Sequence, residues 1–416
     1  MQQKAMDKVD KILDQFTDPL TGSVHGAVFI AIDSSGNIIY HRAAGKANLD
    51  DERAPALQTN FLYWIASMTK LVTAVAVMQL VERGIVSLED DVRAIVPELR
   101  DIQILEDIRN ELNQLHLKPV QGKITLRNLL CHTAGFVYDS SSPLLQKWSK
   151  SQGRTAHTFC GSMAGYQHPL LFEPDTSWGY GAGLDWAGRV IECLTNSTLE
   201  DYMQTHIWSK LGARSTTFHP ELYRETLPPQ MGMGYRVSVG QGTKSLKSGP
   251  IILKQPAQDD LGGIGLFSTP MDFVKLLSAL LGGGYPLLTR ESVDILLRPQ
   301  LSDASREAMP RPLGAQMRRV LGIRDARDTQ QADHSLAGTI TLKDIAGRRR
   351  AGTVNWSGLP NLHWWIDRQT GIAATLFTQV MPLGDAAITS LLIDLEESLY
   401  AALEESAVPM KVDVKL

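Results

Sequence analysis

Ser67 and Lys70, three residues apart, are the two side chains of this chain best suited to covalent chemistry. They open a stretch in which apolar residues recur at helical spacing from Leu71 to Val81, before a polar last turn that ends at Gly84. Because positions i and i+3 lie on the same face of a helix, the Lys70 amine can reach the Ser67 hydroxyl. We therefore expect a buried helix that begins near Ser67 and carries both groups.

A serine hydroxyl becomes a strong nucleophile when a base removes its proton, and a lysine can be that base if burial lowers the pKa of its amine. The apolar flanks offer that burial, and the free N–H groups of a first helical turn can stabilise an oxyanion. The spacing alone is weak evidence, since about one S-x-x-K match is expected by chance in a chain of this length. It is nevertheless the single match here. A helix-capping serine and a lysine that reaches solvent are the structural alternative.

Two segments far along the chain could supply the second proton carrier and the oxyanion partner that such a site needs. Tyr180 lies in the turn-rich segment EPDTSWGYGAGLDWAG, where small neighbours leave room for its phenol. In NWSGLPN, residues 355–361, Gly358 would let a ligand approach the backbone, and the N–H groups of an edge strand could bind a carbonyl oxygen. A structural tyrosine and a simple strand-to-turn transition are the alternatives.

Composition and missing motifs narrow the classes of function. The chain has 41 basic and 45 acidic residues, a net charge of -4, which is no surplus for binding nucleic acid or an anionic membrane. The ten histidines include no H-x-H or H-E-x-x-H spacing, and His132 and His363 are interpreted as packing or hydrogen-bonding residues. P-loop, GxGxxG and G-x-S-x-G patterns are also missing. We therefore expect neither a metal nor another cofactor.

The three cysteines and the N-terminal sequence bear on the location of the protein. An odd number of cysteines without a C-x-x-C pair indicates packing in a reducing compartment. The start of the chain, MQQKAMDKVDKILDQF, is charged and amphipathic, unlike a secretory signal, and no window approaches 18 uninterrupted apolar residues. These features predict a cytoplasmic protein that does not interact with a membrane.

The elements around these residues change in type along the chain. A surface helix over Met6–Phe16 and a hairpin of Ala27–Ile32 with Ile38–Ala43 precede the central helix. From Ser87 to Gly212, short helical signals with capping residues dominate and strand signals are scarce. Strand-like runs and a long amphipathic helix then close the chain: Thr353–Asn355, Leu362–Ile366, Ala373–Thr378 and Asp385–Glu404.

We expect an α+β fold in which both ends of the chain build one mostly antiparallel sheet, flanked by the terminal helices. This lobe would comprise residues 1–86 and 213–416, and a helical lobe would comprise residues 87–212. Ser67 would lie at the seam between the lobes, where a pocket can form. The polar, arginine-rich stretch Arg306–Ala332 is typical of a surface insertion or flap.

Five segments, taken in order, resemble the serine β-lactamase-like superfamily of class C β-lactamases, penicillin-binding proteins and related esterases. They are IASMTKLVTAVAVMQLVERG, ITLRNLLCHTAG, EPDTSWGYGAGLDWAG, GGIGLFSTPMDF and WSGLPN, and the resemblance runs from about Gly26 to Leu403. The chain is most similar to the branch of fungal statin side-chain acyltransferases, of the lovastatin transesterase type, and related esterases of secondary metabolism. The resemblance implies a two-lobed β-lactamase/transpeptidase-like fold.

The resemblance also implies roles for the candidate residues. Ser67 would be the acylated nucleophile, Lys70 its proton acceptor, and Tyr180 the general base and acid that activates the acyl acceptor. The segment WSG, residues 356–358, stands where lactamases carry K-T-G. The oxyanion hole would accordingly consist of the N–H groups of Ser67 and Leu359.

Departures from the lactamase pattern bear on the substrate. Ala182 stands where lactamases carry an asparagine that holds a substrate amide, and Trp356 replaces the lysine of K-T-G, which anchors a substrate carboxylate. Trp356 and Trp178 instead favour an apolar acyl or polyketide-like group. Ser357 and Gly358 complete the predicted substrate-binding set.

We therefore expect a serine acyltransferase or esterase. It would form an acyl-enzyme on Ser67 and pass the acyl group from an ester or thioester to an alcohol of a small natural product. A coenzyme A thioester or an acyl carrier domain would be the donor. A carboxylesterase that hydrolyses small-molecule esters and a non-catalytic binding protein of the same fold are the alternatives.

Overall fold

A computed structural model describes residues 2–50, 55–109, 114–238, 244–323, 325 and 328–407 of the 416-residue chain. Its centre is a seven-stranded sheet in which each neighbouring pair is antiparallel. In spatial order the strands are β2 (Ile38–Gly45), β1 (Gly26–Asp33), β13 (Ile372–Phe377), β12 (Leu362–Asp367), β11 (Val354–Gly358), β10 (Thr339–Thr341) and β9 (Ala332–His334). The N-terminal hairpin pairs with the C-terminal strands through β1 and β13, as the sequence predicted.

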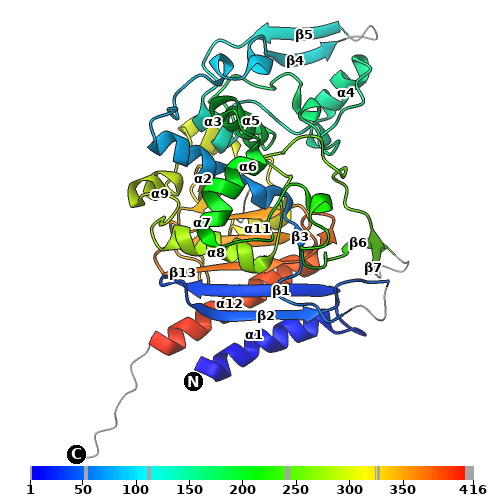
Figure 1. The fold of residues 1–416 in the computed structure, drawn as a ribbon, viewed down its shortest axis with the longest axis vertical. Coiled ribbons are helices and arrows are strands. Elements are labelled where there is room, and N and C mark those ends of the chain that lie inside the picture. The colour runs from blue at the N-terminus through cyan, green and yellow to red at the C-terminus, as the bar shows by residue number, and fades with distance from the viewer. Residues whose placement is uncertain are drawn as a thin grey trace, which may run out of the picture.

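Helices cover both faces of this sheet. Successive side chains of β1 point to opposite faces, so Phe29 and its alternate neighbours pack with α1 (Gln2–Thr17) and α12 (Ala386–Ala407). Ile30 points to the other face, into the main core that includes α8 (Pro270–Leu281). Figure 1 shows α1 on one side of β1 and β2 and α8 on the other, and α12 packs against α1. The α+β arrangement predicted from the sequence is therefore confirmed.

Helix α2 (Thr69–Glu82) runs through the middle of the molecule. Its residues from Thr69 to Leu80 are all buried, so apolar side chains surround the helix instead of lining one face. A 3₁₀ turn, η1 (Ala66–Met68), precedes it and holds Ser67. The α-helix itself begins at Thr69, two residues after the serine. Ala66, just before the serine, adopts a left-handed φ of 44° and turns the chain there.

The region between α2 and α8 is mainly helical, but it also contains strands that the sequence reasoning missed. Its helices are α3 (Leu126–Cys131), α4 (Pro143–Ser151), α5 (Gly183–Thr195), α6 (Leu199–Met203) and α7 (Ser209–Leu211), with a π-helical turn, Gln204–Trp208, before α7. Strands β4 (Gln103–Arg109) and β5 (Gln114–Pro119) form an antiparallel hairpin at the far end from α1 (Figure 1). Charged residues such as Glu106 and Lys118, which form an ion pair of 2.8 Å, interrupt the apolar alternation by which a strand is recognised in a sequence. The boundaries of the predicted helical lobe, residues 87–212, stay a prediction.

Shorter elements complete the fold. They are β3 (Tyr63–Trp64), β6 (Met233–Ser238), β7 (Lys244–Gly249), β8 (Phe267–Ser268), β14 (Val380–Met381), α9 (Arg290–Leu296), α10 (Asp303–Ala308) and α11 (Ala315–Val320). The predicted flap, Arg306–Ala332, includes the end of α10 and all of α11, while residues 324, 326 and 327 of it lie outside the described chain. Among the described residues, no helix combines the length and apolar character needed to cross a membrane.

Candidate active site

Ser67 lines a cavity of about 550 Å³. The residue is 8% exposed, and it lies in η1 between the short strand β3 and helix α2. The strained left-handed conformation of Ala66 turns the chain sharply immediately before the serine, which is how strand and helix can meet at such a tight corner. A nearly buried hydroxyl at a cavity wall meets the steric requirement for a nucleophile.

The Lys70 amine lies in the first turn of α2, as the i, i+3 spacing predicted. Its Nζ atom is 3.3 Å from Ser67 Oγ, within hydrogen-bond distance. It also lies 3.0 Å from the Tyr138 hydroxyl and 2.8 Å from the Gly263 carbonyl oxygen. The residue is 3% exposed, so the amine contacts protein groups and not bulk water.

Tyr138 and Asp185 extend this cluster, and the sequence reasoning missed both. The Tyr138 hydroxyl donates to Asp185 Oδ2 over 3.0 Å, and the Gly263 N–H donates to Asp185 Oδ1 over 2.8 Å. Burial raises the pKa of Asp185 to about 6, against the opposing effect of Lys70, so the carboxylate is ionised at neutral pH. Burial and this carboxylate raise the pKa of Tyr138 well above its ordinary value, which keeps the phenol protonated.

One signal could have revealed Asp185. It lies in α5 between Leu184 and Trp186, and all three residues are fully or almost fully buried. An acidic residue inside an apolar run requires a partner, because an unpaired buried charge is very costly. Tyr138 gives no comparable signal, since it is separated from Lys70 by 68 positions and from Asp185 by 47.

Tyr180 approaches Lys70 with its ring and not with its hydroxyl. The Lys70 amine lies 4.8 Å from the centre of the Tyr180 ring, a cation–π distance. The Tyr180 hydroxyl accepts a long hydrogen bond of 3.4 Å from Trp356 Nε1. The structure thus brings Tyr180 into the cavity wall next to Lys70, and its role as general base stays a prediction.

The segment 356–359 meets η1 at the same cavity, which Trp356, Ser357 and Leu359 line. Strand β11 lies between β12 and β10, so it is not the edge strand that the sequence predicted. Its pairing with β10 ends at Asn355, however, and the remainder of β11 packs against η1. The N–H groups of Ser67 and Leu359 remain the predicted oxyanion hole.

Gly358 has a different reason to be glycine than the one expected from the sequence. A Cβ atom at this position would lie 2.5 Å from the carbonyl oxygen of Ile65, a backbone atom just before η1. Gly358 itself does not line the cavity. Its lack of a side chain therefore allows β11 to approach η1 closely, and its part in substrate binding stays a prediction.

Aromatic rings build one wall of the cavity. Trp178 and Trp356 line it, and their rings flank that of Tyr180 at centroid distances of 6.4 and 5.2 Å. His132 lies behind them, 4.7 Å from the Tyr180 ring, and burial lowers its pKa well below the ordinary value. Burial also lowers the pKa of neighbouring His334, to about 4, so both imidazoles are neutral and belong to the packing of the wall.

The rest of the lining is apolar or carries hydroxyl groups. Among the described residues that line the cavity, none has a charged side chain. Leu313 and Met317 reach it from the predicted flap, and Phe159 and Phe172 from the mainly helical region. Ala182, the position of the lactamase asparagine, is fully buried and does not line it. The cavity therefore suits an apolar acyl group.

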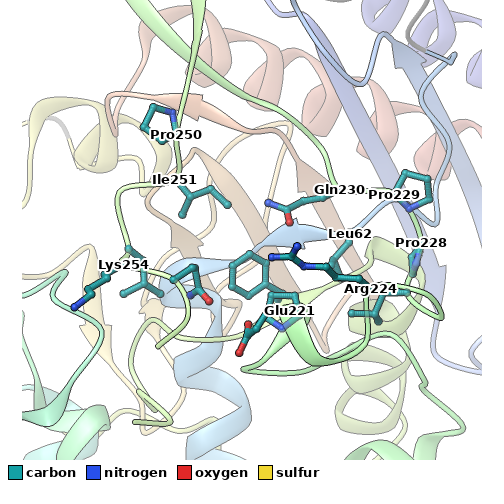
Figure 2. A pocket seen from close by; sticks show the side chains of 14 residues that line it. Leu62, Glu221, Arg224, Pro228, Pro229, Gln230, Pro250, Ile251 and Lys254 are labelled. Atoms are coloured by element: carbon teal, nitrogen blue, oxygen red, sulfur yellow. The ribbon is translucent and has the colours of Figure 1, made fainter. Parts of the chain in front are cut away.

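A second cavity, of about 810 Å³, is lined by residues that include Leu62 and Lys254 (Figure 2). Glu221, Arg224 and Lys254 give it charged side chains, and its other lining residues include four prolines. Among the described residues that line it, none is a serine, cysteine, threonine or histidine. Ser67, the predicted nucleophile, lines the smaller of these two cavities.

Comparisons with known proteins identify the family of this chain. A model of the β-lactamase family matches residues 9–397. The chain is 33% identical to lovastatin esterase from Penicillium rubens, over 91% of this chain and 95% of that protein. It is 31% identical to monacolin J acid methylbutanoyltransferase from Aspergillus terreus, over 92% of this chain and 93% of that protein.

Solved structures give the same result for the fold. A variant of simvastatin synthase from Aspergillus terreus superimposes with a TM-score of 0.86 at 30% identity and covers 97% of this chain and 98% of its own. The hydrolase EstCE1 is 19% identical, with a TM-score of 0.73, and supports the fold alone. The chain belongs to the β-lactamase family, and it is an enzyme of the serine acyltransferase and esterase type.

Proposed function

We propose that this protein forms an acyl-enzyme on Ser67 and transfers the acyl group from an ester or thioester to an alcohol of a small natural product. The observation that carries the proposal is the 3.3 Å contact between Ser67 Oγ and Lys70 Nζ at the wall of an uncharged cavity. The names of the relatives, a lovastatin esterase and a methylbutanoyltransferase, support this reaction class.

The first half-reaction is acylation. Neutral Lys70 accepts the Ser67 proton while Oγ bonds to the carbonyl carbon of the donor, and the oxyanion develops toward the Ser67 and Leu359 N–H groups. The bond from that carbon to the leaving oxygen or sulfur then breaks, and the proton held by Lys70 passes to the leaving group. The products are the acyl-enzyme and a free alcohol or thiol, and Lys70 is neutral again.

The second half-reaction passes the acyl group to the acceptor. Tyr180 and Lys70 lie together beside Ser67. As the oxygen of the incoming alcohol bonds to the acyl carbon, Tyr180 takes the alcohol proton and passes its own phenol proton to the Ser67 oxygen, whose bond to the acyl carbon breaks. Trp178, Trp356 and Ser357 contact the acyl group or the acceptor, since they line the same cavity.

Transfer and hydrolysis differ only in the acceptor, so a carboxylesterase is the second candidate. The lovastatin esterase from Penicillium rubens, 33% identical to this chain, favours it. The apolar, aromatic wall favours transfer, because exclusion of water would protect the acyl-enzyme until an alcohol binds. The donor would be a coenzyme A thioester or an acyl carrier domain. The unpaired state of all three cysteines is compatible with the predicted cytoplasmic location.

Intact-mass spectrometry tests the proposal directly. Incubation with aryl esters or acyl thioesters should add one acyl group to the wild type and none to Ser67→Ala. Lys70→Ala should also remain unacylated, and wild-type rates in that variant would mean that another base operates. Addition of candidate alcohols then separates transfer from hydrolysis by the fate of the acyl group. A protein that acquires no adduct from any donor would be the non-catalytic alternative.

A chromogenic cephalosporin provides a second check on the substrate. Because Ala182 and Trp356 replace the polar groups that lactamases use for recognition, we expect its hydrolysis to be much slower than that of a short-chain aryl ester. Equal rates would contradict the proposed substrate class.

A further inference from the structure

The Lys70 amine is held by two oxygen atoms that can act only as acceptors. One is the Gly263 carbonyl oxygen, 2.8 Å away, which has no hydrogen to give. The other belongs to Tyr138, 3.0 Å away. The third oxygen near the amine, Ser67 Oγ at 3.3 Å, is the one whose proton must be removed.

Tyr138 is restricted to accepting from Lys70 because its own proton is already in use. The phenol donates over 3.0 Å to Asp185 Oδ2, and an ionised carboxylate can only accept hydrogen bonds. The Tyr138 oxygen therefore presents a lone pair, and not a proton, to the amine.

Asp185 also holds the second acceptor of Lys70. Its Oδ1 atom accepts the Gly263 N–H over 2.8 Å, and the Gly263 carbonyl in turn accepts from Lys70. A Cβ atom on residue 263 would lie 2.3 Å from Asp185 Oδ2, so this approach requires glycine. One fully buried carboxylate thus fixes both groups that hold the amine.

A neutral lysine amine has two hydrogens and one lone pair. If the two hydrogens are donated to Tyr138 and Gly263, the lone pair remains for the third neighbour, Ser67. We infer that Asp185 is a positioning residue, which acts through Tyr138 and Gly263 to direct the Lys70 lone pair at the Ser67 hydroxyl. This inference rests on the proposed function, and it assigns a role to a carboxylate that does not itself line the cavity.

The ionised state of Asp185 is part of this arrangement. The titratable groups that face it are Lys70 from α2, Tyr138 next to the cavity, and Tyr166, whose pKa burial and Asp185 raise. Since burial raises the pKa of Asp185 to about 6, the carboxyl is protonated below this pH. It can then donate to Tyr138, and the phenol proton is free to turn toward Lys70 and occupy its lone pair.

Asp185→Asn reproduces this reversal at neutral pH with almost no change in shape. The asparagine oxygen still accepts from the Gly263 N–H, but its NH₂ group donates to Tyr138, so the phenol proton turns to Lys70. We expect the rate at which a fluorophosphonate probe labels Ser67 to fall by about 10²-fold. This readout needs no knowledge of the natural acyl donor. Glu200→Gln is the matched control, because Glu200 is another buried carboxylate, bonded to Thr217 and Phe218, and should label at the wild-type rate.

A double-mutant cycle separates positioning from general damage. Tyr138→Phe removes the link, so adding Asp185→Asn to it should change the labelling rate by less than about 3-fold. The acid limb of the wild-type labelling profile, near pH 6, should also be absent from both asparagine variants. Two results would overturn the inference. One is an Asp185→Asn variant that the probe labels at the wild-type rate. The other is a double variant in which Asp185→Asn slows labelling of the Tyr138→Phe enzyme as much as it slows labelling of the wild type.

Failure of the proposed function gives a different result. If the probe labels Ser67 in the wild type but no ester or thioester acylates it, the acyltransfer proposal fails while the effect of Asp185 is still measured. If Ser67 is not labelled at all in a folded wild type, both the function and the inference are wrong.

Discussion

Two tyrosines flank Lys70, and they present different atoms to its amine. Tyr138 offers its hydroxyl at 3.0 Å, whereas Tyr180 offers its ring, with the amine 4.8 Å from the ring centre. The Tyr180 hydroxyl is directed to Trp356 instead, over a long 3.4 Å contact that an incoming substrate can replace. The Tyr138 hydroxyl thus contacts the Lys70 amine, whereas the Tyr180 hydroxyl does not.

The effect of Tyr180→Phe should fall on the second half-reaction. The ring and its contact with Lys70 remain, so acylation of Ser67 should stay within about 10-fold of the wild type. Transfer to an alcohol should slow by about 10²-fold or more, because the proton carrier is lost. Pre-steady-state kinetics with an aryl ester should then show an undiminished burst and a slower steady state. An unchanged kcat would remove Tyr180 from the mechanism.

Asp185→Asn should have opposite effects on labelling and on stability. Because burial raises the pKa of Asp185 from its ordinary value to about 6, the folded protein holds this proton more tightly than the unfolded chain. The free energy of unfolding therefore falls as pH rises from about 4 to about 6 through this group. At pH 8 the asparagine variant should be more stable than the wild type by about 1–3 kcal/mol. Urea unfolding at pH 4 and pH 8 checks this, and a variant less stable at both pH values would contradict it.

At the level of single residues, the sequence predicted the contact between residues that are close together in the chain. Ser67 and Lys70 are three positions apart, so helix geometry alone predicted their contact. The bonds from Tyr138 to Lys70 and Asp185 join residues that are tens of positions apart and carry no spacing pattern. Gly358 was recognised as a point of close approach, and the backbone group that approaches it in the structure is the Ile65 carbonyl.

At the level of secondary-structure elements, segments in which apolar residues recur with a clear period were predicted correctly. The terminal helices and the hairpin β1–β2 lie close to the predicted ranges. Each helix packs one apolar face on the sheet, and the hairpin consists of two strand-forming runs around a turn. The hairpin β4–β5 was not predicted, because charged and apolar residues are mixed in its sequence. The pairing of two strands is also not encoded in either strand alone. The expected flap proved to include α11, whose Met317 reaches the cavity.

The close contact between β11 and η1 predicts the outcome of Gly358→Ala. A methyl group 2.5 Å from the Ile65 carbonyl oxygen must push η1 away from β11, which separates the Ser67 and Leu359 N–H groups. We expect Ser67 labelling to slow by more than about 10-fold, with a loss of about 1–3 kcal/mol in the free energy of unfolding. Gly122→Ala is the control, because its nearest contact is the flexible Glu173 carboxylate at 3.4 Å. Equal labelling rates in the two variants would show that this contact does not set the site geometry.

At the level of the whole molecule, a separate apolar cluster lies on the face of the sheet opposite the Ser67 cavity. The apolar cluster of α1, α12 and the outer face of β1 and β13 includes none of the residues that line the Ser67 cavity. The main core on the other face holds α2 and the cavity wall. Damage to the first cluster should therefore lower stability while the folded fraction keeps its activity.

Leu13→Ala tests this separation. Leu13 is fully buried between α1 and the sheet, so its truncation should lower the free energy of unfolding by about 2–5 kcal/mol. Below the unfolding transition, the Ser67 labelling rate should match the wild type. Exposed Lys11→Ala, on the same helix, should alter neither quantity. A labelling rate that falls in the folded Leu13→Ala protein would show that the two faces are coupled.

The burial of α2 from Thr69 to Leu80 also limits how such an enzyme can change its substrate. A helix with protein on every side cannot shift without disturbing the core, so Lys70 and the adjoining Ser67 are effectively fixed in place. Divergence toward new acyl groups must then proceed at the cavity rim, where Leu313 and Met317 belong to a short segment near the surface. Libraries randomised at that rim should yield altered selectivity at little cost in folding, whereas libraries within α2 should yield mostly insoluble protein.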